Sequence, residues 1–148
     1  DEGFLYLSLV TDMVAKDIVG WDISDSLEAD GAVRALKMAM RALPSGIPIV
    51  AHSDRGSQYG SRKYLEALGL AGWKSSMTEE LHCYENAMAE RLNGILKGEY
   101  YLDYHFRTKA EAIAEVRRVI KIYNTRRLHE KLGYKTPAAY RAEYMKAA

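Results

Sequence analysis

The order of hydrophobic patterns along the chain restricts its fold class more than any other feature. Strand and helix patterns alternate in the order strand, strand, helix, strand, helix, strand, over residues 4–10, 18–23, 26–43, 47–51, 61–70 and 73–77. The first two strands are close enough along the chain to form a hairpin. The later strand–helix–strand order favours a crossover in an α/β layer. We therefore expect an α/β fold in which helices flank a mixed sheet.

The last third of the chain is predicted to be helical. A helix is expected over residues 86–100, and Thr108 with Glu111 forms a capping-box signature for a second helix that runs to about Tyr123. Thr136 and Pro137 then mark the start of a third. The chain has 148 residues, so we expect one domain over residues 1–148, with 101–148 as a basic helical extension of it.

Charge is distributed unevenly along the chain. Residues 1–96 contain nine Lys or Arg against fourteen Asp or Glu, a net charge of −5, whereas residues 97–148 contain twelve against six, a net charge of +6. A basic segment with interleaved tyrosines suits a phosphate-rich partner, and an acidic one can hold cations. Solvated helix faces explain the same distribution without a partner.

Several classes of protein and site are not supported by the composition. No apolar run approaches the ~20 residues of a membrane-spanning helix. The single cysteine, Cys83, excludes an internal disulfide and a multi-cysteine zinc site. The histidines lack the i, i+4 spacing of a helical zinc pair, and we predict no zinc site from His52, His82, His105 and His129.

One face of the helix expected at 86–100 carries polar residues suited to chemistry. At 100° per residue, Asn86, Asn93 and Lys97 lie within about 60° of Glu90, and the apolar residues lie opposite. An amphipathic helix with a solvated face has the same pattern. The asparagines argue against that interpretation, because Glu, Lys or Gln would stabilise an exposed helix better.

Asp54 follows the apolar run at 47–51, at the strand end where open α/β sheets bind ligands. By itself it could be a turn residue that caps its own backbone. Together with Glu90 it predicts a Mg²⁺ site, because hard cations prefer carboxylate oxygens. Two ions about 3.5–4 Å apart would suit an in-line phosphoryl displacement.

Ordered motifs along nearly the whole chain resemble one family, the bacterial insertion-sequence transposases with an integrase-type catalytic core. The matching segments are His52–Tyr59, Cys83–Ala87 with Glu90, Leu96–Glu99, Tyr123–Asn124 with Arg127 and His129, Leu132–Tyr134, and Thr136–Pro137. Asp54 and Glu90 are separated by 35 residues, the spacing between the second and third acids of this family's Asp-Asp-Glu triad.

The resemblance implies a ribonuclease-H-like fold and a metal-dependent DNA transposase. In that family the triad binds two Mg²⁺ or Mn²⁺ ions, cleaves DNA at the transposon ends and joins the 3′-hydroxyl to target DNA. The expected catalytic and metal-binding residues are therefore Asp54 and Glu90. The resemblance also implies self-association and a bacterial, cytoplasmic and nucleoid-associated protein.

DNA contacts are expected from basic and amide side chains. Lys97 shares the helix face of Glu90, and the densest basic segment contains Arg126 and Arg127 with Lys121 and Lys131. Such residues contact phosphates without reading sequence. The predicted DNA-binding residues are Lys97, Asn86, Asn93, Arg55, Arg126 and Arg127.

The sequence departs from the family pattern in three ways. No residue matches the first aspartate of the triad. In the family, the strand that carries this aspartate lies between the strands expected here at 4–10 and 47–51. We therefore expect a gap in the sheet and no normal activity from these residues alone. Glu79 and Glu80 replace a common basic pair, and Glu85 a common aspartate.

Two alternative functions stay open. One is a nuclease or retroviral-type integrase of this fold, and the other is a catalytically silent DNA-binding or assembly module.

Overall fold

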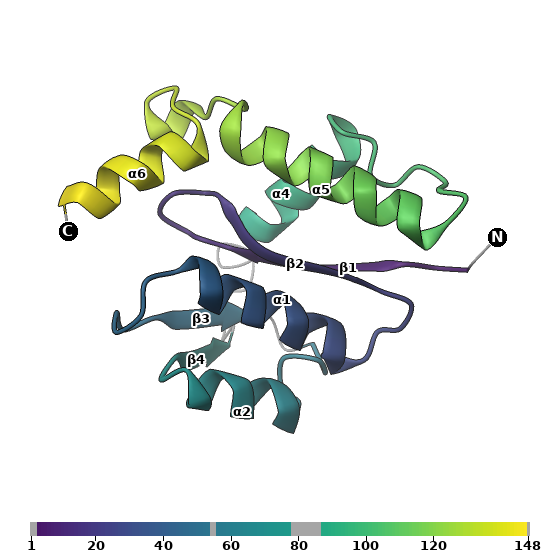
Figure 1. The fold of residues 1–148 in the computed structure, drawn as a ribbon, viewed down its shortest axis with the longest axis horizontal. Coiled ribbons are helices and arrows are strands. Elements are labelled where there is room, and N and C mark those ends of the chain that lie inside the picture. The colour runs from purple at the N-terminus through teal and green to yellow at the C-terminus, as the bar shows by residue number, and fades with distance from the viewer. Residues whose placement is uncertain (1–2, 54–55, 78–86, 148) are drawn as a thin grey trace. The chain divides into compact units, whose positions relative to one another are not determined.

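The predicted α/β order of elements is confirmed by the structure (Figure 1). The computed structural model describes residues 3–53, 56–77 and 87–147. The strands are β1 (Tyr6–Thr11), β2 (Ile18–Ser24), β3 (Val50–Ser53) and β4 (Lys74–Met77). The helices are α1 (Ala29–Ala42), α2 (Arg62–Leu70), α4 (Ala87–Gly98), α5 (Lys109–Thr125), the 3₁₀ turn η1 (Glu130–Leu132) and α6 (Pro137–Ala147). Within the described residues, no helix is long and apolar enough to cross a membrane.

The described strands form two separate two-stranded sheets. β1 pairs with β2, and β3 pairs in parallel with β4 through the crossover helix α2. No ladder joins the two pairs within the described part of the chain. The two pairs are therefore separate sheets in this structure, and the expected gap between the strand at 4–10 and the strand near 50 stays a prediction.

The third strand begins later than its sequence pattern predicts. The strand was expected at residues 47–51 as a buried segment, but β3 covers Val50–Ser53 and Val50 is 61% exposed. Pro48 has no backbone N–H to donate to a ladder. Pairing begins at Ile49, whose carbonyl accepts from the Lys74 N–H at 2.9 Å. The later start brings His52 and Ser53 into the strand.

The described residues divide into two compact units, one containing residues 3–10 and 19–94 and the other containing 11–18 and 95–147. The first unit has a core of buried residues from α1 and α2, with Ala51 of β3 and Trp73 packed against it. Its cluster consists of Ala32, Leu36, Tyr64, Ala67 and Leu68. The prediction of a single domain with an extension from residue 101 stays a prediction.

Strand β2 lies unusually close to α1 in this unit. A Cβ atom at Gly20 would lie 2.1 Å from the Ala35 carbonyl oxygen and 2.9 Å from the Ala39 nitrogen. Arg34 of α1 also binds Asp22 of β2 through two hydrogen bonds of 2.8 and 2.9 Å. Only glycine at position 20 allows this approach of strand and helix.

The second unit contains α5, η1 and α6. The start of α5 matches its predicted cap, since Thr108 Oγ1 accepts from the Glu111 N–H at 3.1 Å and Glu111 accepts from the Arg107 N–H at 2.9 Å. Thr136 likewise accepts from the Ala139 N–H at 3.2 Å, ahead of the buried Pro137. α5 contacts α6, and the buried residues of α5 are Ala112, Val116, Val119, Ile120 and Tyr123.

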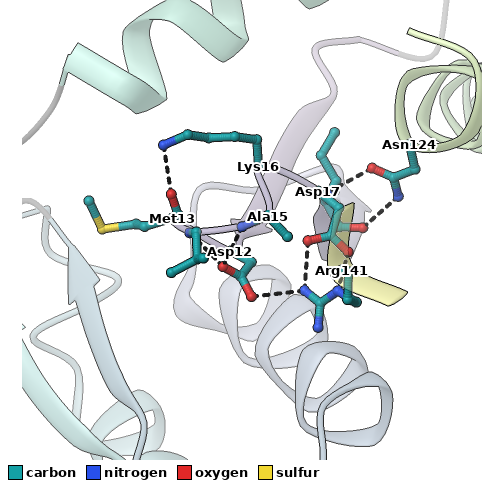
Figure 2. Close-up of polar contacts among 9 residues, drawn as sticks. Asp12, Met13, Ala15, Lys16, Asp17, Asn124 and Arg141 are labelled. Carbon is teal, nitrogen blue, oxygen red and sulfur yellow. Dashed lines mark hydrogen bonds and ion pairs between the residues drawn. The ribbon is translucent and has the colours of Figure 1, made fainter. Parts of the chain in front are cut away.

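The turn between β1 and β2 belongs to this second unit and is held by side chains from the C-terminal helices. Arg141 of α6 donates to both carboxylate oxygens of Asp17 at 2.6 Å and to Asp12 at 3.0 Å (Figure 2). Asn124 at the end of α5 bonds both the N–H and the carbonyl of Ile18, each at 2.9 Å. We call Asp12, Asp17, Asn124 and Arg141 the turn clasp.

Asp17 is a buried carboxylate, which is stable only when its charge is compensated. Burial disfavours the charge on Arg141, but its hydrogen bond with Asp17 and the attraction of both carboxylates outweigh this and raise the pKa of Arg141. Asp12 meanwhile accepts from the N–H groups of Val14 and Ala15 at 2.7 and 3.1 Å. The turn clasp therefore joins segments more than 100 residues apart in sequence.

Candidate functional site

The carboxyl ends of β3 and β4 lie at the same edge of a parallel pair, with His52 opposite Ser76 and Ser53 opposite Met77. The predicted metal ligand Asp54 follows β3 directly. Open α/β sheets bind ligands at such strand ends. Several predicted positions lie outside the described residues, namely Asp54, Arg55, Glu79, Glu80, Glu85 and Asn86.

His52 is held by the register of this parallel pair. Its Nδ1 lies 3.2 Å from the Ser76 Oγ on the neighbouring strand. Its Nε2 is buried and has no hydrogen-bond partner within the described part of the chain. A polar atom without a partner is costly to bury, which is why such atoms often mark functional positions. His52 begins the matching segment His52–Tyr59, and the structure adds the contact of its ring with Ser76, two residues before Asp54 in the sequence.

Glu90 lies in the first turn of α4 and is exposed. The helical face predicted around it is confirmed for the described residues, because Asn93 and Lys97 are also exposed whereas Leu92 and Leu96 are buried. No ion pair or hydrogen bond engages the Glu90 carboxylate within the described residues. Its oxygens are therefore accessible, as a ligand of a hard cation requires.

The chemistry of the donor set fits a hard divalent cation only in part. Over the ranges 3–53, 56–77 and 87–147, no three His, Cys, Asp or Glu side chains gather closely enough to hold a metal ion. Glu90 supplies one suitable carboxylate. The pairing of Glu90 with Asp54 stays a prediction.

Arg127, predicted to contact DNA, is engaged by another part of the chain. Its guanidinium donates to both oxygens of Glu99 at 2.7 and 2.9 Å, and the side chain is only 20% exposed. The hydrogen bond to Glu99 raises the pKa of Arg127 against the opposing effect of burial. The Arg127 Nη1 also lies 3.4 Å from the Nε2 of His129, whose ring meets Tyr123 edge-on.

We call this bidentate ion pair the Arg127–Glu99 tie. It joins the residues after α4 to the residues after α5. The separation of 28 residues gave the sequence no local signal for the pairing. The geometry gives Arg127 a structural partner, and its contact with DNA stays a prediction.

The other predicted basic contacts are more accessible. Lys97 lies in the last turn of α4, Arg126 caps the end of α5, and both are exposed. Lys121 and Lys131 are exposed as well. Within the described residues, none of these four cations forms an ion pair with an acidic side chain.

Known proteins resemble this chain along nearly its whole length. It is 37% identical over 148 residues to an uncharacterized 31 kDa protein of insertion element IS600 from Shigella sonnei. The match covers 99% of this chain and 54% of that protein. It is 39% identical over 138 residues to the transposase for insertion sequence element IS904 from Lactococcus lactis, covering 92% and 54%. It is 33% identical over 141 residues to the transposase InsF for insertion sequence IS3A from Escherichia coli, covering 95% and 49%.

Solved structures show the same fold at low sequence identity. A chain of the simian T-cell lymphotropic virus intasome in complex with a PP2A regulatory subunit has a TM-score of 0.72 at 17% identity, with 91% of this chain and 47% of that chain covered. The HTLV-2 integrase catalytic core domain in complex with magnesium has a TM-score of 0.66 at 16% identity, with 93% and 92% covered. These likenesses confirm the predicted ribonuclease-H-like fold.

Two profiles described as integrase core domain match the chain, one over residues 1–83 and the other over residues 71–137. The chain spans about half the length of the curated relatives that it matches. The predicted resemblance to transposases of bacterial insertion sequences is confirmed. Because one profile covers more than half of the 148 residues, the chain belongs to the integrase core domain family.

Proposed function

We propose that this chain is the metal-dependent catalytic core of a DNA transposase, which cleaves DNA ends and joins the 3′-hydroxyl to target DNA. The observation that carries the proposal is the similarity to insertion-sequence transposases over 92% or more of the chain. Asp54 and Glu90 occur in the sequence in the order and at the spacing expected of such an enzyme. The substrate class is DNA, both as transposon ends and as target.

Asp54 and Glu90 would hold Mg²⁺ or Mn²⁺ at the carboxyl end of β3 and the first turn of α4. When bound, such ions polarise the phosphoryl oxygens and lower the pKa of the attacking group. A two-ion site is expected in the complete enzyme. The HTLV-2 integrase core was determined in complex with magnesium, and the shared fold supports the same cation here.

The remaining predicted residues would position DNA. Lys97 lies seven residues beyond Glu90 in α4 and is also exposed, and it is proposed to contact a DNA phosphate. Asn93 lies between them, and Asn86 and Arg55 are proposed for the same substrate. Arg126 would contact the DNA backbone as a free cation. Arg127 would join it only by sharing or releasing Glu99.

We further propose that these 148 residues alone do not carry out efficient strand transfer, because no residue matches the first acid of the triad. Self-association is also proposed, and the HTLV-2 integrase core, which forms a trimer and a dimer, supports it. A bacterial cytoplasmic location with association to the nucleoid is the corresponding proposal for the whole protein.

Titration with Mn²⁺ tests the metal site, with the free ion followed by electron paramagnetic resonance. We expect the wild-type chain to bind Mn²⁺ and Asp54→Asn and Glu90→Gln each to lose most of that binding, because each removes a carboxylate ligand. Asp103→Asn is the matched control, since Asp103 is an exposed acid far from both ligands in sequence.

Equal Mn²⁺ binding by Asp54→Asn and the wild type would refute the metal site and leave Asp54 as a turn residue. If the chain then still bound DNA, the silent DNA-binding module would be the better description. Efficient Mg²⁺-dependent strand transfer by the 148 residues would contradict the proposal that they are inactive alone.

A further inference from the structure

Two exposed tyrosines occupy backbone conformations that a tyrosine normally avoids. Of the described residues other than glycine, only Lys16, Tyr101 and Tyr134 have a positive φ, at 63°, 56° and 56°. This left-handed region is unfavourable for any side chain with a Cβ and suits glycine best. Lys16 has a local reason, because its Nζ donates to the Met13 carbonyl across the turn at 2.6 Å.

Tyr101 stands where a helix normally ends with glycine. The Tyr101 N–H donates to the Lys97 carbonyl at 3.0 Å, and the Leu102 N–H donates to the Leu96 carbonyl at 3.1 Å. The first bond, from the left-handed residue to the carbonyl four residues earlier, is that of the αL C-cap motif, whose left-handed residue is usually Gly. The Tyr101 side chain is 69% exposed and has no hydrogen-bond partner within the described residues. Neither packing nor local bonding therefore accounts for a tyrosine here.

Tyr134 repeats this situation in a second loop. It follows Gly133, which is also left-handed at a φ of 64°, and its N–H donates to the His129 carbonyl at 2.9 Å. The loop is closed by a bridge between His129 and Lys135. The Tyr134 side chain is 68% exposed. Backbone strain of this kind tends to occur at binding sites, where the side chain serves a partner.

The two loops belong to the same compact unit and are joined by the Arg127–Glu99 tie. Glu99 lies two residues before Tyr101, and Arg127 approaches His129, whose carbonyl holds Tyr134. Exposed cations precede both tyrosines in the sequence, with Lys97 four residues before Tyr101 and Lys131 three residues before Tyr134. The surroundings are basic, since residues 97–148 have a net charge of +6.

We propose that Tyr101 and Tyr134 are stacking platforms for unpaired bases of DNA. A tyrosine ring offers a flat uncharged surface that fits the face of any base, and the neighbouring cations attract the phosphates that connect the bases. The bases of a duplex are stacked on one another and do not offer their faces. The inference rests on the proposed DNA function and adds a preference for single-stranded segments to it.

Fluorescence anisotropy with two labelled probes of one mixed sequence tests this inference, one probe single-stranded and the other a blunt duplex. We expect Tyr101→Gly and Tyr134→Gly each to weaken binding of the single strand by roughly five- to a hundredfold, the range for loss of one stacked base, while affinity for the duplex is unchanged. The dependence of the logarithm of affinity on the logarithm of salt concentration should keep its slope, because tyrosine releases no counterion.

Three variants separate stacking from other roles. Tyr101→Phe keeps the ring and should bind the single strand like the wild type. If the Tyr101 hydroxyl instead donated a hydrogen bond to a phosphate, this variant would bind more weakly. Tyr144→Ala removes an exposed tyrosine of α6 with ordinary helical backbone and should leave both affinities unchanged. Arg126→Ala should reduce the salt slope by about one. Melting temperatures of the two glycine variants should stay close to that of the wild type, since glycine suits the left-handed backbone.

The outcomes that would overturn the inference are distinct from failure of the proposed function. If the wild-type chain bound neither probe, the DNA function itself would fail. If the wild type bound both probes and the glycine variants bound them equally well, only the stacking role would fail. A loss of the same size on duplex and single strand, or a change in oligomeric state at constant affinity, would also refute stacking.

Discussion

Tyr64 of α2 is buried beside Leu36 and Leu68, with the ring of Tyr59 edge-on at 5.4 Å. Burial raises the pKa of Tyr64 to about 12. The folded chain therefore keeps this proton to higher pH than the unfolded chain, whose tyrosines ionise near pH 10. Stability that is present below pH 10 should fall by up to about 2 kcal/mol as the pH rises from about 10 to about 12. Urea unfolding at several pH values measures this.

Tyr64→Phe is the control for this prediction, because it keeps the ring and removes the ionising hydroxyl. The hydrogen bond with Asp30 also raises the pKa of Lys63, so only the difference between wild type and variant reports Tyr64. An identical fall in stability for both proteins would show that the Tyr64 hydroxyl does not contribute.

At the scale of elements, the contact between β2 and α1 depends on Gly20. Gly20→Ala places a methyl group 2.1 Å from the Ala35 carbonyl, and backbone atoms cannot move aside as a flexible side chain can. We expect a loss of about 3 kcal/mol or more in the free energy of unfolding, measured by urea denaturation.

Gly69→Ala provides the matched control within the same unit. No atom lies within 4 Å of the added methyl group, and position 69 lies inside α2. This variant should be more stable than the wild type by roughly 0.5–1 kcal/mol, because alanine has a higher helix propensity than glycine. Wild-type stability of Gly20→Ala would mean that β2 and α1 lie further apart than described.

At the scale of the whole molecule, the turn clasp joins the early turn to the C-terminal helix. Arg141→Ala leaves the buried Asp17 carboxylate without its partner, and we expect a loss of about 3 kcal/mol in the free energy of unfolding. Hydrogen exchange should quicken at residues 11–18, where the Ile18 N–H depends on Asn124 of the same clasp. Exchange in α1 and α2, which belong to the other unit, should change little.

Arg118→Ala tests whether any lost ion pair in this unit has the same effect. Arg118 pairs with Glu115 on the surface of α5, with the arginine side chain more than half exposed. Surface pairs contribute about 1 kcal/mol or less. Similar losses for Arg118→Ala and Arg141→Ala would contradict the assignment of a special role to the turn clasp.

Local signals in the sequence predicted the elements well. Thr108 with Glu111 and Thr136 with Pro137 act as caps within a few residues of themselves, so no distant contact is needed to recognise them. The start of β3 was missed because a short apolar run does not show where pairing begins, and Pro48 delays it. Of the candidate site, the exposed face with Glu90, Asn93 and Lys97 was predictable from helical period alone.

Contacts between distant residues could not be predicted in this way. Arg126 and Arg127 are adjacent arginines that the sequence does not distinguish. In the structure Arg127 forms an ion pair with Glu99, whereas Arg126 is exposed. Asp17 and Arg141 meet across 124 residues, and nothing near either residue in sequence identifies its partner.

The amino-acid sequence by itself determined the α/β order of elements, the helix caps and the family, because hydrophobic period, capping chemistry and spaced motifs act over short stretches of chain. Only the tertiary structure decided which charges are paired inside the protein and which are exposed. It also decided which tyrosines adopt a left-handed backbone conformation. The physical reason is that burial and ion pairing depend on which distant segments meet, and that is a property of the folded chain as a whole.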